Sequence, residues 1–518
     1  METEAYRNRL RELEPRLRHL LPADLYVAMW VNPDRETLTA AHDHLRTLYR
    51  ILFDHIPRHV AEAGASPGDI SYEWQEGTLM FTDLAGFTPL LEAFSVYGQA
   101  GAIDLLGILN DYFSTIIEIV GKSGGLLLEF TGDAILVQFP SNKYQDTTQQ
   151  AVNCGLRMQR AMEKFDSIQT PKGQLSLGMR IGLHQGRYLA ATIGTPRRME
   201  QVLLGTDVRE TKLAEGGGRI GQVNLTPEAY APVADVFRSE PGDEDYRLVV
   251  DDLTGEELGD YDLMAFNARR LPSALVMDRS QAGLTQAVEE ILAKTEPLAS
   301  YLPAPILNFL VEHASQGAPP PALSKAAVIF VNLIGLSEGV EDMDETDVDR
   351  VIERFSEVFA LINAAVEARG GVLKHVTYHL SGADVLIYFG LPNAHSDDPA
   401  RASATADAIR EIVANTPSPY DPDERLATKI GINFGEIFAA EVGEARGRRE
   451  WNILGDTVNV AARLMGIAEP NQILMTESVY HEIWRTFECD PLRRVSLKGK
   501  SRAIPVFSLL EPIQGDAT

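Results

Sequence analysis

Two aspartates in the first part of the chain have the side chains and the setting of a metal site. Asp83 ends a short apolar run, Thr78–Thr82, and Asp133 lies in a turn between two apolar segments. If these segments are strands of one sheet, the two carboxylates lie side by side, and carboxylate oxygens are ligands that Mg²⁺ prefers. The competing interpretation is that they are two unrelated turn acids.

The segment that follows Asp83 is suited to bind an anion. Its backbone amides lead into the N-terminus of a predicted helix, where unpaired amides attract phosphate. Gly86 lets the chain approach an anion closely. Thr88 and Pro89 predict an N-cap and a first-turn proline for a helix that reaches about Val120. The predicted phosphate contacts are Leu84, Ala85, Gly86, Phe87 and Thr88.

A complementary pair of residues lies near the other end of the chain. Asn459 and Arg463 are four positions apart in a predicted helix, so both side chains share one face. Asp456 or Thr457 can cap that helix. An arginine on such a face can stabilise the negative charge that develops on a phosphate during its transfer. The competing interpretation is a helix with an arginine at its surface.

These two sets of residues belong to two copies of one sequence unit. Phe81–Thr88 recurs as Phe330–Ser337, and Gly182–Gly194 recurs as Gly431–Gly443, each at an offset of 249 residues. A constant offset over blocks that lie far apart indicates that a whole domain has been duplicated.

The two copies have lost complementary features. The first copy alone has an acid in its first block, Asp83 against Asn332, and a cation in its second block, Arg187 against Glu436. The second copy alone has the segment Gly455–Arg463 with its asparagine and arginine. We therefore predict one competent site shared between the copies and one degenerate site.

Length, charge and hydropathy narrow the class of protein. The 518 residues include 47 basic and 74 acidic side chains, and the net charge of −27 argues against nucleic acid or an anionic membrane as the main partner. No apolar run is long enough to span a membrane, and the start lacks the basic and apolar regions of a secretory signal, so we expect a cytoplasmic protein. Cys154 and Cys489 are expected to be packing residues and not a disulfide.

The patterning predicts five regions. They are a helical N-terminal region, a first repeat, a helical linker, a second repeat and a tail, at residues 1–72, 73–270, 271–323, 324–511 and 512–518. The order strand, helix, hairpin, helix, strand in the first repeat predicts an α/β fold, an α+β sandwich with helices flanking a mostly antiparallel, ferredoxin-like sheet. Two basic runs, Arg197–Arg198 and Arg446–Arg449, are predicted to be solvated hairpin arms.

Taken together, the blocks resemble the class III nucleotidyl cyclase domain. The resemblance rests on Phe81–Thr88, the Gly132–Asp133 turn, Gly455–Arg463 and Leu497–Lys500, and the tandem arrangement is similar to that of soluble adenylyl cyclases. It implies an intramolecular pseudo-heterodimer that converts ATP to 3′,5′-cyclic AMP and pyrophosphate.

The same resemblance implies a role for each candidate residue. Asp83 and Asp133 would hold two Mg²⁺ ions, for which Mn²⁺ can substitute. Asn459 would orient the ribose, and Arg463 would stabilise the transition state. Two further cations would contact the triphosphate, and the alternative for each is a solvated surface position. These cations are Arg187 and Lys498.

Recognition of the base stays open. Adenylyl cyclases usually pair a lysine with Asp or Thr, and the second of these positions is Asn452, whose amide can bond either purine. The lysine position falls on His375, and a shift of one residue would make Lys374 the base contact; the alternative for Lys374 is an exposed strand position. In the first copy the position where soluble cyclases carry a lysine is Glu129, which puts bicarbonate binding in doubt.

Three functions compete at this point. An adenylyl cyclase leads, and the alternatives are a cyclase that uses GTP or a pyrimidine triphosphate and a catalytically silent, nucleotide-responsive regulator. The expected partner is a small-molecule nucleoside triphosphate, with no nucleic acid and no integral membrane association. The sequence leaves open the regulator and the choice between a monomer and a homo-oligomer.

Overall fold

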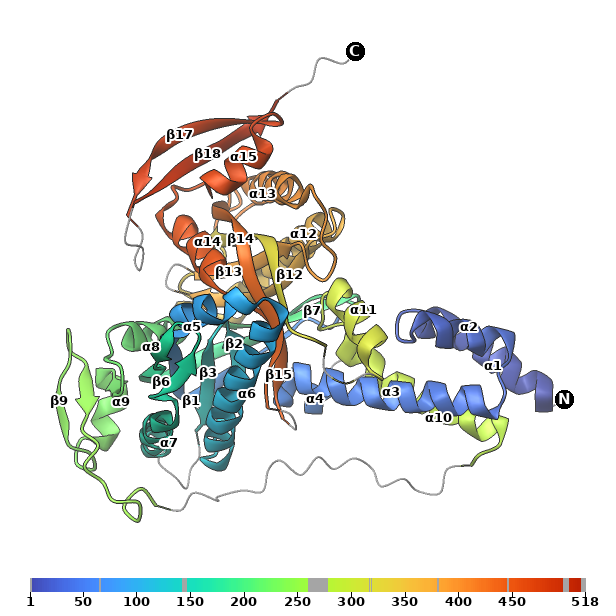
Figure 1. Cartoon of the computed structure of the whole chain (residues 1–518), viewed down its shortest axis with the longest axis horizontal. Coiled ribbons are helices and arrows are strands. Elements are labelled where there is room, and N and C mark those ends of the chain that lie inside the picture. The colour runs from blue at the N-terminus through green and yellow to red at the C-terminus, as the bar shows by residue number, and fades with distance from the viewer. Residues whose placement is uncertain are drawn as a thin grey trace.

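A computed structural model describes residues 2–64, 67–141, 147–259, 278–315, 317, 319–379, 382–444, 447–496 and 503–513. These residues form two α/β domains of the same topology and a helical arm that extends to one side (Figure 1). Lys498 lies outside the described residues.

The first domain is built on a sheet with the strand order β2-β3-β1-β6-β8-β10-β9, and β7 pairs with β6. The strands are β1 (Ser71–Ala85), β2 (Leu126–Thr131), β3 (Ala134–Pro140), β6 (Gly178–Thr195), β7 (Arg198–Leu204), β8 (Val223–Leu225), β9 (Ser239–Pro241) and β10 (Arg247–Val249), with a separate ribbon of β4 (Ile168–Thr170) and β5 (Gly173–Leu175). The helices are α5 (Phe87–Phe94), η1 (Ser95–Tyr97), α6 (Gln99–Lys122), α7 (Thr147–Ala161), η2 (Met162–Phe165), α8 (Thr206–Gly216), α9 (Pro227–Tyr230) and η3 (Ala231–Val233).

The second domain repeats this plan with the order β12-β13-β11-β14-β16-β18-β17, and β15 pairs with β14. The strands are β11 (Ala322–Ile334), β12 (Val372–His379), β13 (Gly382–Phe389), β14 (Ala427–Gly443), β15 (Arg449–Leu454), β16 (Gln472–Thr476), β17 (Phe487–Val495) and β18 (Ile504–Pro512). The helices are η4 (Val340–Asp342), α12 (Glu345–Glu367), α13 (Asp398–Ala414), α14 (Asp456–Ile467) and α15 (Glu477–Ile483).

Each sheet is mostly antiparallel, as predicted. The central strand β1 pairs antiparallel with β3 and β6, and β11 pairs antiparallel with β13 and β14; the parallel pairs are β6 with β8 and β14 with β16. The middle of β1, Thr78–Thr82, and of β11, Ala326–Ile329, is buried. A continuous buried run is expected where both faces of a strand are covered. The sequence therefore places the central strand of each domain correctly.

The two domains share their hydrophobic cores. The cluster between α6 and the first sheet also contains residues of β14 and β15: Phe438, Ala440, Val442 and Leu454. The cluster between α12 and the second sheet also contains residues of β6 and β7: Leu189, Ala191, Ile193, Val202, Leu203 and Leu204. In Figure 1, β14 and β15 extend from the second domain down past α6. Each domain thus completes the core of the other.

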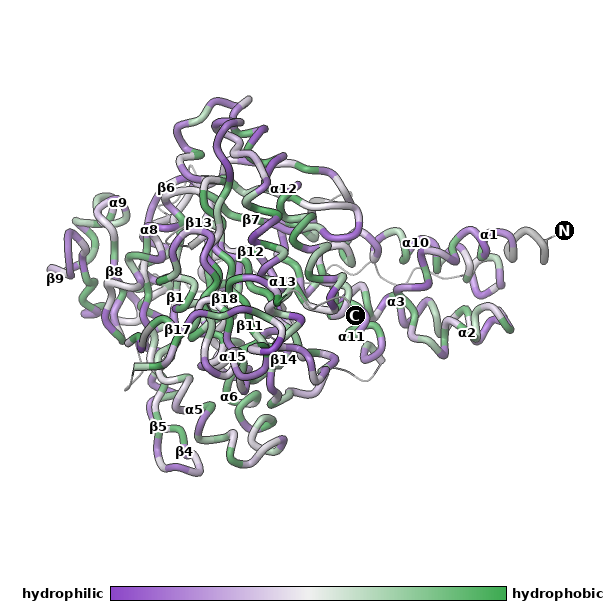
Figure 2. Tube along the Cα trace, turned by 90° about the horizontal axis from the view of Figure 1, so that it is seen from above, coloured by the Kyte–Doolittle hydropathy of each residue, from purple (hydrophilic) through white to green (hydrophobic). Residues whose placement is uncertain are grey.

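The helical arm combines segments from both ends of the first domain. Its helices are α1 (Glu2–Leu17), α2 (Ala23–Val31), α3 (Arg35–His55), α4 (Arg58–Ala63), α10 (Gln281–Ala299) and α11 (Ala304–His313). Leucines at helical spacing on α3 face α10, and the same cluster continues into Trp451 and Ile453 of β15. Viewed from above, α1, α2 and α10 lie farthest from the domains (Figure 2). The arm is therefore anchored on the second domain through β15.

Three local predictions were wrong. The helix after the phosphate loop has Gly86 as its N-cap, two residues before the predicted N-cap Thr88, and its first residue is Phe87. It ends at Phe94, and a separate helix, α6, continues past Val120. A positive φ of 96° at Gly86 explains the early start, because glycine alone adopts this conformation without strain. The helix α14 begins after Gly455 with no side-chain cap bond, so neither Asp456 nor Thr457 caps it.

The prediction of solvated arms is wrong for Arg198, Arg448 and Arg449, whereas Arg197 is exposed as predicted and Arg446 lies outside the described residues. The side chain of Arg198 is 3% exposed, and those of Arg448 and Arg449 are 12% and 20% exposed. All three pair with acids, and they lie where the domains and the helical arm meet.

Candidate active site

Asp83 lies at the end of β1, directly opposite Arg180 of β6. The Arg180 guanidinium donates to the Asp83 carboxylate at 2.5 Å and forms an ion pair of 2.8 Å with Glu215 of α8. The sequence analysis missed Arg180. The signal was available, because the antiparallel pairing of two strands sets Asp83 and Arg180 in register once both strands are recognised.

Asp133 lies in the tight turn between β2 and β3, next to Asp83. Burial, and after it the negative charge of Asp83, raises the pKa of Asp133 to about 7. The register of β1 and β3 places Thr82 opposite Ile135, so Asp83 lies beside the turn that carries Asp133. A divalent cation between the two carboxylates would relieve their repulsion.

The carboxylates of Asp83 and Asp133 are suitable ligands for Mg²⁺ or Mn²⁺, but they supply only part of the coordination that either ion requires. Within the described ranges there is no group of three or more His, Cys, Asp or Glu side chains that could hold a metal ion. The two aspartates would thus leave most positions around a metal to backbone carbonyls, water and substrate oxygens, and Mg²⁺ bound with phosphates is usually held in this way.

The loop between Asp83 and α5 is shaped for close backbone approach. Leu84 and Phe87 are 4% and 3% exposed, so their side chains are packed in the core. Contacts of these two residues with a ligand would therefore come from their backbone. A Cβ atom on Gly86 would lie 2.5 Å from the Ser176 carbonyl, which excludes any larger residue. Ala85, Gly86 and Thr88 are half-buried. The predicted anion-binding segment is therefore formed by the backbone of a rigid turn at a helix N-terminus.

Asn459 and Arg463 reach this region from the second domain. A Cβ atom on Gly455, at the start of α14, would lie 3.1 Å from the side chain of Leu91 on α5. The N-terminus of α14 thus packs against the helix that follows the phosphate loop. Asn459 is exposed and Arg463 is half-buried, and neither has a hydrogen-bond or ion-pair partner among the described residues. Both side chains are free to meet a ligand.

The structure does not bring Arg187 to Asp83. In the register of β1 and β6, Arg187 lies opposite Glu76, seven residues along the strands from the Asp83–Arg180 pair. The distance between the two positions along the strands is roughly 23 Å, at about 3.3 Å per residue. Its guanidinium stacks on Trp74 at 4.6 Å and donates to the backbone carbonyl of Glu341 at 3.2 Å. Arg187 therefore lies on the side of the degenerate site, and Arg180 is the cation beside Asp83.

The strand register separates Lys374 from His375. Lys374 is the bulged residue of β12, and the matching bulge in β2 falls at Leu128, so His375 occupies the place of Glu129. Lys374 forms an ion pair of 2.5 Å with Glu450. Burial, and after it the charge of Lys374, lowers the pKa of His375 to about 3, so the imidazole is neutral.

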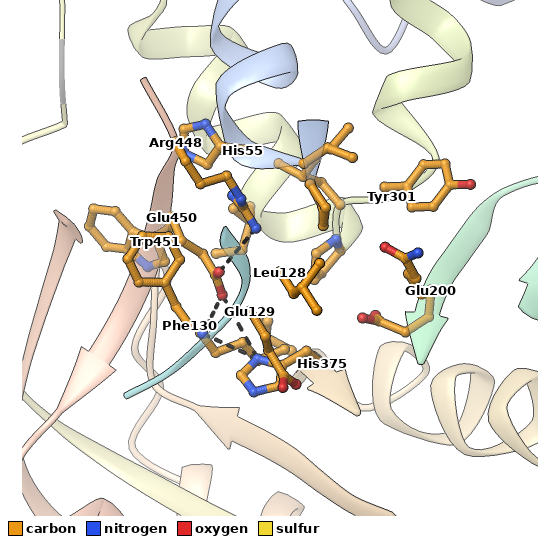
Figure 3. A pocket seen from close by; sticks show the side chains of 18 of the residues that line it. His55, Leu128, Glu129, Phe130, Glu200, Tyr301, His375, Arg448, Glu450 and Trp451 are labelled. Carbon is orange, nitrogen blue, oxygen red and sulfur yellow. Dashed lines mark hydrogen bonds and ion pairs between the residues drawn. The ribbon is translucent and has the colours of Figure 1, made fainter. Parts of the chain in front are cut away.

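Behind these residues lies a cavity of about 110 Å³, closed on one side by the helical arm (Figure 3). Glu450 faces Arg448 in it at 3.5 Å, and His55 and Tyr301 line the arm side. The acids and bases of this cavity are largely paired with each other. It is a polar junction between the domains and the arm.

Asn452 is buried at the domain boundary. Its Nδ2 donates to the carbonyl of Gly132 at 2.6 Å, and its Oδ1 accepts from the amide of Ile453 at 3.0 Å. The residue is 1% exposed. The amide that was predicted to contact a base therefore bonds the backbone of the turn that carries Asp133.

The degenerate site is filled by protein groups. Asn332, in the place of Asp83, donates to Asp384 at 2.8 Å. Lys212 of α8 enters from the first domain, donates to the Tyr378 carbonyl at 2.6 Å, and its charge acts on both Asp384 and Glu129. Burial raises the pKa of Asp384 to about 7. An internal ammonium group thus faces the remaining acids there.

Comparison with known proteins finds the same domain twice. The model of the adenylate and guanylate cyclase catalytic domain matches residues 71–246 and 324–510. Adenylate cyclase type 10 of Oryctolagus cuniculus is 25% identical over 440 residues, which cover 79% of this chain and 25% of that protein, and the Homo sapiens protein is 25% identical over 422 residues. The chain spans about a quarter of the length of these relatives.

A solved structure shares the tandem fold. A class III adenylyl cyclase-like ATP-binding protein from Pseudomonas aeruginosa aligns with a TM-score of 0.54 at 14% identity, over 86% of this chain and 93% of that one. Among the described helices, none combines the length and the apolar character that crossing a membrane requires.

Proposed function

The chain belongs to the family of adenylate and guanylate cyclase catalytic domains, and from that premise we propose that it converts ATP to 3′,5′-cyclic AMP and pyrophosphate. The reaction would take place at one site between its two domains. The similarity to adenylate cyclase type 10, which covers 79% of this chain, supports ATP as the substrate.

The observation that carries the proposal is the division of the site between domains. Asp83, Asp133 and the phosphate loop come from the first domain, and Asn459 and Arg463 come from the second. The contact between Leu91 and Gly455 sets the two parts against each other. Neither domain alone has both parts, whereas the degenerate site lacks an acid at Asn332 and is filled by Lys212.

Each group of the competent site would act on a different part of the substrate. Divalent metal ions held by Asp83 and Asp133 would polarise the phosphate and favour loss of the proton from the ribose 3′-hydroxyl. The backbone amides of Leu84–Thr88 would bind phosphate oxygens. Asn459 would orient the ribose, and Arg463 would stabilise the charge on the α-phosphate as pyrophosphate leaves.

Arg180 adds an electrostatic step to this scheme. Its guanidinium donates to one oxygen of Asp83 at 2.5 Å and pairs with Glu215 at 2.8 Å. These two acids would hold Arg180 beside the predicted phosphate-binding segment, where it would bind a phosphate oxygen of the triphosphate and neutralise part of its charge.

A second candidate function is nucleotide binding without turnover. It is favoured by the pairing of Lys374 with Glu450 and of Asn452 with Gly132, because both groups predicted to read the base are already bonded within the protein. The alternative that this chain is a cyclase for GTP or a pyrimidine triphosphate is tested by the same experiment.

One experiment separates these functions. Purified chain is incubated with each of four nucleoside triphosphates with Mg²⁺ or Mn²⁺, and the cyclic product is identified by mass. We expect cyclic AMP from the unaltered chain and none from Asp83→Ala or Asp133→Ala, with the exposed Asp104→Ala of α6 as a matched control. Binding of ATP with no product from any triphosphate would establish the second function, and product from Asp133→Ala at the unaltered rate would refute the site.

A further inference from the structure

Asn452 makes the shortest polar link between the second domain and the turn that bears Asp133. Its Nδ2 lies 2.6 Å from the Gly132 carbonyl oxygen. Next to it, the side chain of Leu454 lies 3.8 Å from the place of a Cβ on Gly132, and Leu454 belongs to the core of the first domain. The end of β15 therefore packs on this turn with one polar and one apolar contact.

The carbonyl that Asn452 bonds is part of the peptide unit that joins Gly132 to Asp133. The N–H of that unit belongs to Asp133, so the unit ends at the Cα atom that carries the Asp133 side chain. Since a peptide unit is planar, a bond that fixes its carbonyl also fixes the direction of its N–H. The amide of Asn452 thus restrains the carboxylate through one rigid group.

Gly132 gives this restraint its importance. Its φ is 71°, in the left-handed region that glycine adopts without strain. The pair Thr131–Ala134 closes this two-residue turn from the strand side, and the bond from Asn452 holds its tip from outside. Asn452 is 1% exposed and Leu454 is 3% exposed, so the two groups that hold the turn are themselves fixed by packing.

The same geometry leaves little of the Asn452 side chain for a base. Its Oδ1 accepts from Ile453 and one Nδ2 hydrogen is given to Gly132, so one N–H and one lone pair are left, on a side chain that is 1% exposed. A purine that displaced the two existing bonds would leave a buried carbonyl and a buried amide without partners.

We propose that Asn452 is a positioning residue for the metal-binding turn and not a reader of the base. The inference rests on the proposed function only in taking Asp133 as a metal ligand. It also has a consequence for substrate choice, because a site whose second base-reading position is committed to the protein discriminates between ATP and GTP less than one with a free acceptor or donor there.

The test compares metal binding with base preference in the full-length chain. Mn²⁺ binding is measured without nucleotide from the loss of the free-ion signal in electron paramagnetic resonance. Asn452→Leu keeps the approximate size and shape of the side chain, removes its N–H donor and adds no charge, and Asn452→Ala also removes most of the volume. Asp133→Asn is the reference variant for loss of the site.

We expect both Asn452 variants to weaken Mn²⁺ binding by roughly 2- to 10-fold, the range that corresponds to one hydrogen bond of about 0.5 to 1.5 kcal/mol. The ratio of kcat/KM for ATP to that for GTP should change by less than about twofold, since no base contact is lost. The Mn²⁺ concentration for half-maximal activity should rise in parallel with the binding constant.

Two results would overturn the inference. One is unchanged Mn²⁺ binding in Asn452→Leu, whether or not the base preference shifts. The other is a large change in the ATP to GTP ratio with unchanged metal affinity, which is the behaviour of a base reader. Thermal unfolding of each variant shows whether Asn452→Ala has lost the fold, and Asn452→Leu then decides the question alone. Failure of the cyclase proposal is separate, because it would show as absent product with Mn²⁺ binding and its dependence on Asn452 intact.

Discussion

Replacing Arg449 with methionine should loosen the attachment of the helical arm to the second domain. Arg449 is the first residue of β15, and its guanidinium donates to Asp54 of α3 at 3.1 Å and to Glu441 of β14 at 2.5 Å. The side chains of these acids are only 3% and 4% exposed. Arg449 is thus the cation between two buried carboxylates from different parts of the fold.

The size of the effect follows from what the substitution leaves behind. Methionine fills most of the volume of the arginine stem, so the cavity cost is small, but Asp54 and Glu441 lose their shared cation. Removing one partner of a buried ion pair typically costs about 3 to 5 kcal/mol, because the other charge stays buried and uncompensated. Arg448 also bonds the Asp54 backbone, at 3.3 Å, and its charge acts on Asp54, so Asp54 keeps part of its compensation and the loss should lie at the lower end of this range.

The measurement is unfolding in urea, followed by tryptophan fluorescence of the full chain. A matched control is Arg350→Met, which removes an arginine that is 55% exposed and pairs with Asp347 on the surface of α12. An exposed pair contributes about 0 to 1 kcal/mol, so this variant should unfold near the unaltered midpoint. The double variant Arg449→Met with Glu441→Gln should recover part of the loss, because one of the two stranded charges is gone.

Equal midpoints for Arg449→Met and Arg350→Met would refute the reasoning. Such a result would mean that water reaches Asp54 and Glu441 well enough to solvate them, and that the arm is held by its apolar contacts alone. Because the chain has several parts, the comparison uses the midpoint of the first transition and not a single free energy for the whole molecule.

Three further outcomes are expected. Arg180→Ala should lower kcat/KM for ATP by about 10²-fold or more, the usual cost of a lost charge at a phosphate, whereas Arg187→Ala should change it by less than about threefold; the reverse order would restore Arg187 to the site. Asp384→Asn should gain stability relative to the unaltered chain as pH rises from about 4 to 7, because a carboxyl whose pKa is raised from 3.8 to about 7 in the fold loses its stabilising contribution between these two values and no further above them; parallel melting curves across this range would contradict it. Chains with Asp83→Ala and chains with Arg463→Ala should stay inactive when mixed, as each closed pair lacks one half of the site; recovered activity in a cyclase assay would show exchange of domains between chains.

The sequence predicted the fold well where a repeated block lay on a regular element. The central strands, the hairpin that bears Asp133 and the helix with Asn459 and Arg463 were all placed correctly in the fold, because buried strands and helix faces leave a clear periodic pattern. The resemblance to the cyclase family is also confirmed.

The errors came from positions that depend on pairing across the fold. Arg187 looked suitable because its type differs between the copies, but only the register of β1 and β6 shows that Arg180 faces Asp83. Counting from the sequence placed the lysine position on His375, which the register supports, but it left a shift to Lys374 open, since a bulge has no fixed sequence signature.

A second group of errors concerned burial between domains. Arg448 and Arg449 lie in a short polar run that reads as a surface loop, and their acid partners are far away in the sequence, at Asp54 and Glu441. Asn452 bonds a backbone carbonyl of the other domain, and no residue type marks a carbonyl. The roles of the predicted site residues remain predictions until they are tested.

The shared cores also set a timetable for the newly made chain. The first sheet is complete when Val249 has been synthesised, but its core lacks Leu454, which leaves the ribosome 205 residues later. At about 5 to 20 residues per second, that interval lasts roughly 10 to 40 s. Throughout it the face of α6 that will meet β14 is uncovered, so the nascent first half has to be protected by chaperones or remain only partly folded until the second half arrives.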